Sequence, residues 1–512
     1  MRSIPKYLIL GFCFITVIGS MSLLQGAERN ILFVITDDQS PTLGCYGDPV
    51  AVTPHADQLA KEGTLFRNAY ATVASCSPSR SVVLSGIHNH LNGQYGLAHG
   101  FHHFSAFPNT ISLALPPALS DTGYRTAQIG KLHVSPEEIF RFETYLKGNP
   151  RSAVEMAEAC REFINKKDDR PFFLYFALTD PHRSGERDEN SKREFKPNLF
   201  GNKPDHKAFP EITEVFYEPK KVPVPYFLPD TPECREELAQ YYQSCSRIDQ
   251  GLGRLVSILK DAGLYDKTLI VFTSDHGIAM PGAKTTVYDA GLNVPFVVRN
   301  PYEKDRGIES NALISHADIT PSLLDFADAL DREKNRPKKW VNPEEYWKKR
   351  KERLNENRSG GHRFDRYHGQ SWIPILGISA SAHPESEVVY ASHTFHEGHM
   401  YYPMRAVRDH KFKLIWNLAD GLIFPSASDL WAGSTWQAQY QLGMDAPYGK
   451  RTVRSYLRRS RFELFDIKND PQETTNLADD PRYATILQEY QQKLRNFQQN
   501  TQDPWISKWN HE

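Results

Sequence analysis

The segment from Ala74 to Arg80 contains the residues whose types and order most clearly suggest chemistry. It reads Ala-Ser-Cys76-Ser77-Pro78-Ser-Arg80. If Ser77 caps a helix that Pro78 opens, Cys76 lies at the positive end of that helix, where free amides and the dipole favour an anion. Arg80 then falls in the first turn and can lean back toward Cys76. A lone cysteine before a helix is usually an ordinary buried residue, so its meaning depends on the surrounding motif.

Ionisable residues follow three strand-like runs, each of which is apolar on both faces. These runs are Asn30–Thr36, Pro171–Leu178 and Thr268–Thr273. Such runs are typical of a mostly parallel sheet covered by helices on both faces, and these sheets place ligands at the carboxyl ends of their strands. The groups that follow the runs are Asp37 and Asp38, Asp180 and His182, and Asp275 and His276. We therefore expect three strands to deliver ionisable groups to one edge.

Helix signals alternate with these strands, which indicates an α/β fold. Thr53-Pro54 and Thr231-Pro232 are each a cap followed by a first-turn proline. A stretch at about residues 331–365 is rich in Lys, Arg, Glu and Asn, and is predicted to be a solvated insertion. The expected architecture is a mostly parallel sheet sandwiched by helices, with a smaller α+β domain after it.

The domain boundary is expected near Gly377. Beyond it, strand-like segments precede a final helix, and these elements are expected at residues 387–391, 412–416 and about 481–499. The sequence therefore predicts a catalytic domain at residues 28–377, which contains the charged insertion, and an α+β domain at residues 378–512.

Length and composition describe a globular protein without a strong overall charge. The chain has 512 residues, of which 40% are hydrophobic, and 61 Lys and Arg oppose 62 Asp and Glu. It can bury a large core. Because no global field attracts nucleic acid or a membrane surface, we expect no nucleic-acid partner, and an anion must be bound by a local cluster.

The first 27 residues have the pattern of a secretory signal peptide: a charged start, an apolar stretch and a small-residue cleavage point. No later stretch reaches the roughly 18 apolar residues of a membrane span. We therefore expect an exported protein, periplasmic or secreted, or in a lysosome-like compartment in a eukaryote. Cysteines are few and odd in number after cleavage, which suggests a different role for one of them. The pairing of the others, Cys45, Cys160, Cys234 and Cys245, is left open.

The motif Cys76-Ser-Pro-Ser-Arg80, followed by Ser85-Gly86, resembles the signature of the type I sulfatases of the alkaline phosphatase superfamily. Further motifs of that family follow in order: Asp37-Asp38, Gly130-Lys131-Leu-His133, Asp180-Pro-His182, Ser274-Asp275-His276-Gly277 and Lys284. The resemblance implies that a formylglycine-generating enzyme oxidises Cys76 to formylglycine (3-oxoalanine). One hydroxyl of the hydrated aldehyde attacks sulfur, and the second lets the sulfated intermediate expel sulfate.

The resemblance also implies a divalent cation and a set of fixed positive charges. The cation is expected to be Ca²⁺, with Mg²⁺ or another divalent ion open, and its expected ligands are Asp37, Asp38, Asp275, His276 and the modified Cys76. Lys131 and Lys284 are expected to hold sulfate oxygens, and Arg80 the hydrated aldehyde. His133 is expected to act as the base that collapses the sulfated intermediate, and His182 as the acid for the leaving group.

A narrower resemblance concerns the substrate. The segments His90–Phe104, Asp169–Tyr175, Tyr402–Arg405 and Thr501–Trp505 are similar to stretches of the sulfamidases, or N-sulfoglucosamine sulfohydrolases. This implies removal of sulfate from the nitrogen of a terminal glucosamine in heparan sulfate or heparin fragments, with an amine as the leaving group. The second domain could contribute to the pocket, and its candidates are His396, Glu397 and Arg405.

Other functions remain open because the chain departs from the sulfamidases at three places. Lys284 stands where they carry Arg, His276 stands where they carry Asn, and the charged insertion is additional. An O-sulfatase acting on a sulfated sugar is the first alternative, followed by a phosphoester or phosphonate ester hydrolase. An inactive glycan-binding protein would be expected to have lost charged site residues, and this chain keeps them. An oligomer is compatible with the sequence.

Overall fold

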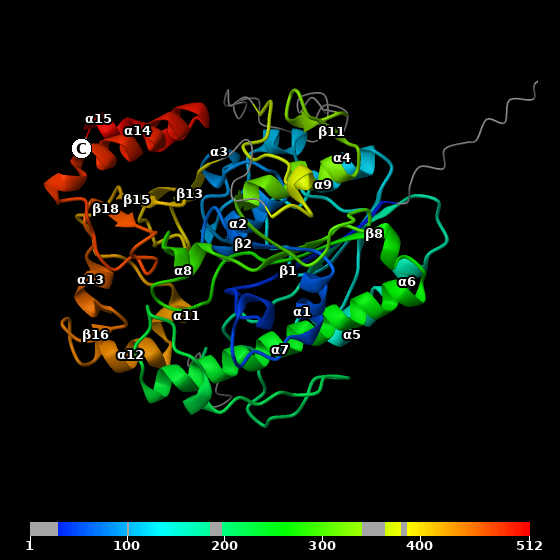
Figure 1. Cartoon of the computed structure of the whole chain (residues 1–512), viewed down its shortest axis with the longest axis horizontal. Helices are drawn as coiled ribbons and strands as arrows, with labels where there is room; N and C mark the ends of the chain where they lie inside the picture. Colours follow the sequence, from blue (N-terminus) through cyan, green and yellow to red (C-terminus); the bar gives the residue numbers. More distant parts are fainter. Residues whose placement is uncertain (1–28, 100–101, 185–196, 340–363, 380–386, 512) are drawn as a thin grey trace, which may run out of the picture.

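The computed structural model describes residues 29–99, 102–184, 197–339, 364–379 and 387–511 (Figure 1). The predicted signal peptide and most of the charged insertion lie outside these residues. Among the described helices, none is both long and apolar enough to cross a membrane. Cys45, Cys76, Cys160, Cys234 and Cys245 are all free thiols.

A large sheet forms the centre of the molecule, with the strand order β10-β2-β9-β8-β1-β7-β5-β6. β9 is antiparallel to both of its neighbours, and the other neighbouring pairs are parallel. The prediction of a mostly parallel sheet is therefore confirmed. The strands are β1 (Asn30–Thr36), β2 (Thr64–Tyr70), β5 (Arg125–Gly130), β6 (Thr144–Tyr145), β7 (Phe172–Ala177), β8 (Thr268–Ser274), β9 (Phe296–Arg299) and β10 (Ile308–Ser315).

Helices cover both faces of this sheet, because alternate residues of its buried strands point to opposite sides. In β1, Leu32 and Val34 pack with one group of helices, whereas Ile31, Phe33 and Ile35 pack with the other. The first group is α1 (Pro54–Lys61), α5 (Ala153–Glu158), α6 (Arg161–Asn165) and much of α7 (Pro232–Asp261). The second group includes α2 (Cys76–Val83), α4 (Leu115–Asp121) and α9 (Ile319–Phe326) (Figure 1).

A second, antiparallel sheet has the order β13-β14-β15-β18 and packs under a C-terminal helix. Its elements are β13 (Val389–His393), β14 (Met404–Arg408), β15 (Phe412–Asn417), β18 (Phe462–Asp466) and α14 (Ala484–Asn500). Trp416 and Leu464 face α14, whereas Ala406 and Ile415 join the core that lies against the main sheet. The smaller α+β unit expected from the sequence is present.

Buried histidines lie where α14 meets the main sheet region. His88, His90 and His368 stack on one another, and Phe497 of α14 packs edge-on against the first two. His90 also contacts the hydroxyls of Ser392 and Thr501, both at 2.9 Å. Burial lowers the pKa of His90 to about 4 and the pKa of His368 to about 3.

Because the pKa values of these histidines are lowered in the folded protein, we expect the free energy of unfolding to decrease in acid. Because the unfolded chain binds protons at about pH 6.5 and the folded chain does so only near pH 4 or below, stability is full above pH 6.5 and is lost as the pH falls toward 4. Each such histidine removes roughly 2–3 kcal/mol from the free energy of unfolding by pH 4. Urea unfolding at pH 7.5 and 4.5 measures this effect. His90→Gln should flatten the dependence, and equal midpoints at both pH values would contradict it.

Candidate active site

The candidate active site lies at the carboxyl ends of β1, β7 and β8. The Asp37 amide donates to the Asp180 carbonyl and the Asp275 amide donates to the Thr36 carbonyl, both at 3.1 Å. These bonds join the segments that follow the three strands. The structure thus brings Asp37, Asp38, Asp275 and His276 to one edge of the sheet, with His182 beside them.

Cys76 reaches this edge from the first turn of α2. The helix begins at Cys76, with Ser75 as its cap, and the Ser79 amide donates to the Ser75 carbonyl at 2.9 Å. The prediction that Ser77 caps the helix and Pro78 opens it is therefore wrong. Pro78 is the third residue of α2. Proline is tolerated in this first turn because the first amides of a helix have no intrahelical acceptor. The Ser77 hydroxyl instead accepts a hydrogen bond from the Ala98 amide at 3.0 Å.

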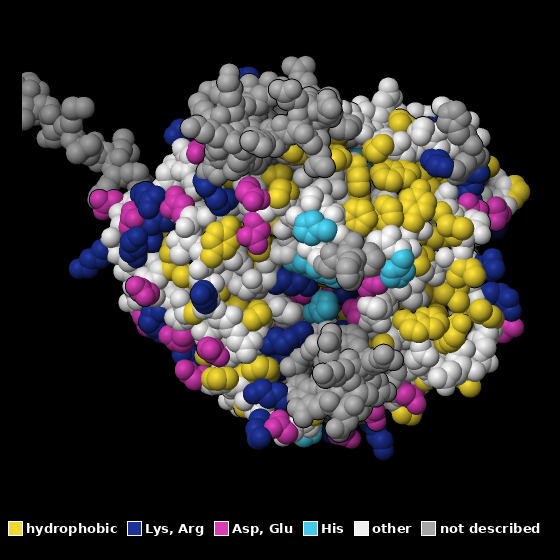
Figure 2. Space-filling model, turned by 180° about the vertical axis from the view of Figure 1, so that it is seen from behind, with side chains coloured by type: hydrophobic (Ala, Val, Ile, Leu, Met, Phe, Trp, Pro, Cys, Tyr) yellow, Lys and Arg dark blue, Asp and Glu magenta, His cyan; other side chains and the backbone are white. Residues whose placement is uncertain are grey.

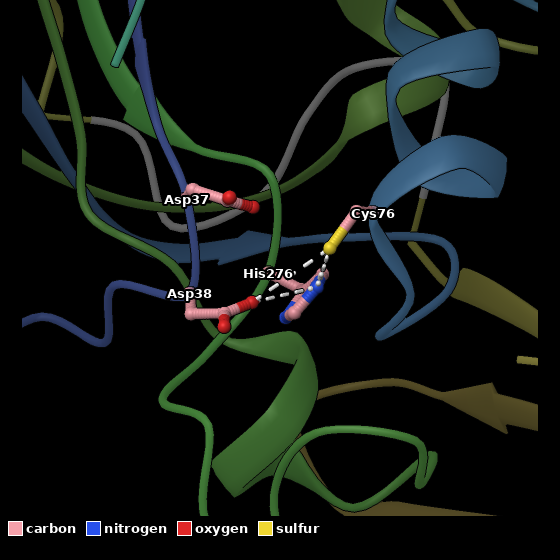
Figure 3. Close-up of side chains that lie close together, drawn as sticks. All are labelled: Asp37, Asp38, Cys76 and His276. Atoms are coloured by element: carbon pink, nitrogen blue, oxygen red, sulfur yellow. Dashed lines mark hydrogen bonds and ion pairs between the residues drawn. The ribbon is translucent and has the colours of Figure 1, made fainter. Parts of the chain in front are cut away.

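Four side chains form a compact set of potential metal ligands: Asp37, Asp38, Cys76 and His276 (Figure 3). One ligand atom from each lies within 4.8 Å of the others, and all four residues are buried. His276 Nε2 is 3.1 Å from Asp38 Oδ1 and 3.5 Å from Cys76 Sγ.

Two observations show that this set fits a divalent cation. Oδ1 of Asp37 is buried, lies 3.6 Å from the Arg80 guanidinium and accepts no hydrogen bond, so its lone pairs are available to a metal ion. His276 Nδ1 lies 3.0 Å from the Gly277 carbonyl. Because a carbonyl only accepts, Nδ1 carries the proton and Nε2 presents its lone pair to the cluster.

Asp275 adjoins this set but already has two partners. Its Oδ1 accepts from the Asp38 amide at 3.0 Å, and its Oδ2 accepts from Arg80 Nε at 2.9 Å. Burial and the neighbouring Asp37 carboxylate raise the pKa of Asp275 to about 6. The buried carboxylates of Asp37 and Asp275 thus repel each other, and nearby positive charge stabilises both in their ionised form.

Three basic side chains balance the carboxylates. Lys131 Nζ donates to Asp37, and Lys284 Nζ donates to Asp38 at 2.8 Å. Arg80, fully buried, pairs with Asp275 and also donates to the Lys131 carbonyl at 2.8 Å. Burial alone would lower the pKa of Lys131, but Asp37, together with Cys76 and Asp275, outweighs burial and raises that pKa, so the lysine stays charged. These three charged side chains therefore lie beside the potential metal ligands, where they would also contact an anionic ligand.

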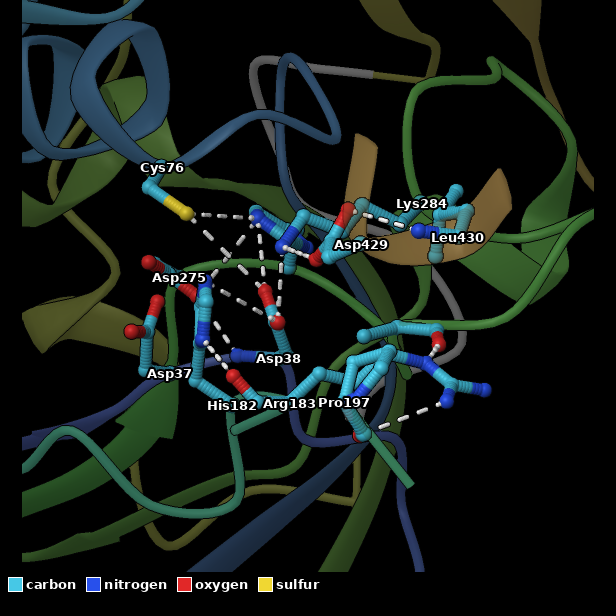
Figure 4. A network of polar contacts seen from close by, with 12 residues as sticks. Asp37, Asp38, Cys76, His182, Arg183, Pro197, Asp275, Lys284, Asp429 and Leu430 are labelled. Carbon is cyan, nitrogen blue, oxygen red and sulfur yellow. Dashed lines mark hydrogen bonds and ion pairs between the residues drawn. The ribbon is translucent and has the colours of Figure 1, made fainter. Parts of the chain in front are cut away.

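Asp429 belongs to the same network, although nothing in its sequence surroundings singled it out (Figure 4). Asp38, His182 and Asp429 each offer an atom within 4.8 Å of the others. The Lys284 ammonium lies 2.8 Å from Asp38 and 3.1 Å from Asp429. Lys284 therefore links the two carboxylates.

The environment of Cys76 opposes thiolate formation. Burial, and then the Asp37 carboxylate, raise the pKa of its thiol well above the ordinary value. A thiol at this position stays protonated near neutral pH and is a poor nucleophile.

The two candidate proton-transfer histidines, His133 and His182, follow β5 and β7. His182 Nδ1 donates to the Arg183 carbonyl at 2.7 Å, which leaves Nε2 to face the site, 3.9 Å from Asp38. Burial and Lys284 lower the pKa of His182 to about 4. His133 has a left-handed backbone (φ 53°), as do Asp38 (φ 67°) and Thr285 (φ 67°). Strained backbone of this kind concentrates at functional sites.

The three pocket candidates of the second domain differ in position. His396 is buried beside the start of α2, with Nδ1 2.8 Å from the Ser75 hydroxyl. Glu397 accepts from the hydroxyl of Ser428 at 2.6 Å, next to Asp429. Arg405 is fully buried in an ion pair with Asp503, so the structure does not bring it to the surface of the site.

One face of the molecule is hollowed where histidine, basic and acidic side chains gather (Figure 2). In the site network, Asp37, Asp38, Arg80 and Lys284 are fully enclosed. Lys131, His182 and Asp429 have exposed side-chain fractions of 15%, 25% and 10%. These three are therefore the groups of the network that a bound ligand can touch first.

Comparison with known proteins identifies a matching family and similar relatives. The family model described as Sulfatase matches residues 29–329. N-sulphoglucosamine sulphohydrolase of Homo sapiens is 36% identical over 499 residues, covering 95% of this chain and 93% of the relative. An ulvan-active sulfatase of Formosa agariphila is 26% identical, covering 92% of this chain and 75% of the relative.

Solved structures share the fold. One, a protein in complex with its substrate D-glucosamine-2-N,6-O-disulfate, has a TM-score of 0.60 at 20% identity and covers 93% of this chain and 98% of its own. The phosphonate monoester hydrolase of Agrobacterium radiobacter also has a TM-score of 0.60, at 18% identity, with 92% and 96% covered. At these identities the likeness extends to the fold, so the predicted architecture is confirmed while the reaction depends on the site.

Proposed function

Because the chain belongs to the sulfatase family, we propose that this sulfate ester or sulfamate hydrolase removes the N-linked sulfate of terminal N-sulfoglucosamine in heparan sulfate or heparin fragments. The observation that carries the substrate is the 36% identity to N-sulphoglucosamine sulphohydrolase along nearly the whole of both chains. The presence of Cys76 among paired carboxylates and fixed cations supports sulfate transfer.

The proposed cofactor is Ca²⁺, held by Asp37, Asp38, Asp275, His276 and the modified Cys76, with Mg²⁺ as the alternative. The cation supplies positive charge that offsets the charge of bound sulfate. The compact set of buried ligand atoms supports this assignment, as does Asp37 Oδ1, which accepts no hydrogen bond.

The proposed nucleophile is formylglycine, made from Cys76 by a formylglycine-generating enzyme, which is thus an obligatory partner. Formylglycine supplies a hydrated aldehyde, in which one hydroxyl attacks sulfur and the other permits sulfate release. The place of Cys76 at the start of α2, beside Asp38 and His276, supports this assignment. Arg80, four residues after Cys76 in α2, is proposed to hold the nucleophile in place.

Lys131 and Lys284 are proposed to bind sulfate oxygens. Each now pairs with a carboxylate of the metal set, so engagement of those carboxylates by a cation leaves lysine N–H groups to donate to sulfate. His182 presents Nε2 to the site and is proposed to protonate the departing amine, while His133 is proposed to be the base that collapses the sulfated intermediate. The anionic substrate favours protonated His182, because negative charge stabilises an imidazolium.

Lys131→Ala tests the lysine assignment. We expect kcat/KM for N-sulfoglucosamine to fall by about a hundred- to a thousand-fold, the scale on which loss of one preorganised charge donor acts. Lys147→Ala, at an exposed lysine nearby in sequence, is the matched control and should be neutral. An unchanged kcat/KM in Lys131→Ala would exclude this lysine from sulfate binding.

The substrate is tested by sulfate release from N-sulfoglucosamine and from 6-O-sulfated N-acetylglucosamine, measured side by side with metal-loaded protein. Release from N-sulfoglucosamine alone is the expected result. Release from the 6-O-sulfate alone would favour an O-sulfatase and contradict the proposal. The proposed location is outside the cytoplasm, periplasmic or secreted, in keeping with the predicted leader.

A further inference from the structure

We infer that Asp429 recognises the glucosamine nitrogen at the cleaved bond and thereby favours N-linked over O-linked sulfate. The inference rests on the proposed function, since it names how that site selects its substrate. It assigns a specificity-determining role to a residue that none of the family-like motifs contains. The carboxylate comes from α11 (Ser428–Trp431), outside the main sheet.

The position of Asp429 places it beside the proposed sulfate site. Its Oδ2 lies 3.1 Å from Lys284 Nζ, and its Oδ1 accepts from the Leu430 amide at 2.9 Å. A carboxylate oxygen of Asp429 also lies within 4.8 Å of both Asp38 and His182 (Figure 4). Sulfate bound by Lys284 would therefore have Asp429 and His182 as near neighbours.

Accessibility separates Asp429 from the purely internal ion pairs of the network. Asp38 and Lys284 have fully enclosed side chains, whereas 10% of the Asp429 side chain and 25% of the His182 side chain are exposed. Each carboxylate oxygen can accept about two hydrogen bonds, and each oxygen of Asp429 has one partner among the described residues. The carboxylate thus retains capacity to accept from a ligand.

The chemistry of the two sulfate linkages explains what this capacity would select. The leaving atom of the substrate is bonded to the sulfur, so it lies beside the sulfate group and within reach of Asp429. In a sulfamate that atom is a nitrogen carrying hydrogen, and it leaves as an amine that becomes an ammonium ion. In a sulfate ester it is an oxygen with lone pairs and no hydrogen. A carboxylate only accepts, so it stabilises the nitrogen group and repels the ester oxygen.

The structure also holds Asp429 and His182 in a fixed relation. Arg183, next to His182, forms a buried pair with Glu237 at 2.9 Å on both nitrogens. Glu237 in turn accepts from the Thr435 hydroxyl at 2.5 Å, in the helix α12 (Ser434–Tyr440) that follows α11. The segment that carries Asp429 is therefore attached to the loop that carries the proposed acid.

The test uses Asp429→Asn in the metal-loaded, formylglycine-bearing enzyme. We expect kcat/KM for N-sulfoglucosamine to fall by about ten- to a hundred-fold, the scale of a hydrogen bond to a charged group. The inhibition constant of the product glucosamine should rise by a similar factor, while that of inorganic sulfate changes little. Asp445→Asn, at an exposed carboxylate, is the control, and Asp429→Glu should restore part of the glucosamine affinity.

An equal rise in both inhibition constants would overturn the inference, because Asp429 would then act only by holding Lys284. An unchanged glucosamine constant would overturn it as well. Wild-type enzyme supplies a test that needs no variant: glucosamine should inhibit at least about ten-fold more strongly than glucose, which has a hydroxyl at the same position. Equal inhibition would contradict the inference. Failure of wild type to hydrolyse N-sulfoglucosamine would instead contradict the proposed function itself.

Discussion

Replacement of Cys76 by serine is expected to lower kcat by at least about a thousand-fold, the scale on which loss of a nucleophile acts. Serine preserves the size of the side chain in the first turn of α2 but offers a single hydroxyl. A sulfate accepted by that hydroxyl can leave only by slow hydrolysis, since no second hydroxyl on the same carbon expels it. The variant should therefore take up at most one sulfate per protein.

Steady-state sulfate release and the intact mass of Cys76→Ser measure this effect together. The matched control is Cys45→Ser, because Cys45 is a free thiol outside the site and its replacement should leave kcat unchanged. Turnover by an unconverted serine variant within about ten-fold of wild type would contradict the proposed nucleophile.

Removal of the divalent cation is expected to have a comparable effect on turnover and to destabilise the fold. Chelation should lower kcat/KM by at least about a hundred-fold, since a catalytic metal supplies several kcal/mol of charge stabilisation. It should also lower Tm, because cation at a hundred times its Kd adds about 2.7 kcal/mol to the free energy of unfolding. Added Ca²⁺ should reverse both changes.

Metal content by elemental analysis and Tm as a function of Ca²⁺ concentration provide the measurement. Asp37→Asn removes a buried carboxylate of the metal set and should weaken the Tm response to Ca²⁺. Asp445→Asn, with an 84% exposed side chain, should keep it. A chelated protein with unchanged Tm and full activity would rule out a bound metal.

The central fold could be predicted from the sequence because its strands are buried on both faces. The runs that became β1, β7 and β8 read as continuous apolar segments, and Asp37, His182 and Asp275 follow their carboxyl ends. Parallel neighbours must deliver such residues to one edge, so local pattern and topology gave the same answer. Thr231-Pro232 likewise predicted the start of α7 correctly, with the Thr231 hydroxyl accepting from the Cys234 amide.

Features that depend on tertiary contacts could not be predicted in this way. The Ser77 hydroxyl does not cap α2 but accepts from the Ala98 amide, 21 residues further along the chain. Asp429 is an isolated acid in a short helix, and only its 3.1 Å contact with Lys284 reveals its place in the site. Arg405 is a predicted pocket residue, but it is buried in an ion pair with Asp503, which lies 98 residues further along the chain.

The chemical identity of residue 76 in the active protein is the most direct test of the proposed nucleophile. Mass spectrometry of the proteolytic peptide that contains residue 76, before and after reaction with an aldehyde-specific hydrazide, should be combined with the rate of sulfate release from N-sulfoglucosamine. We expect formylglycine at position 76, with activity in proportion to the converted fraction. Sulfate release at full rate by protein whose residue 76 is entirely cysteine would contradict it.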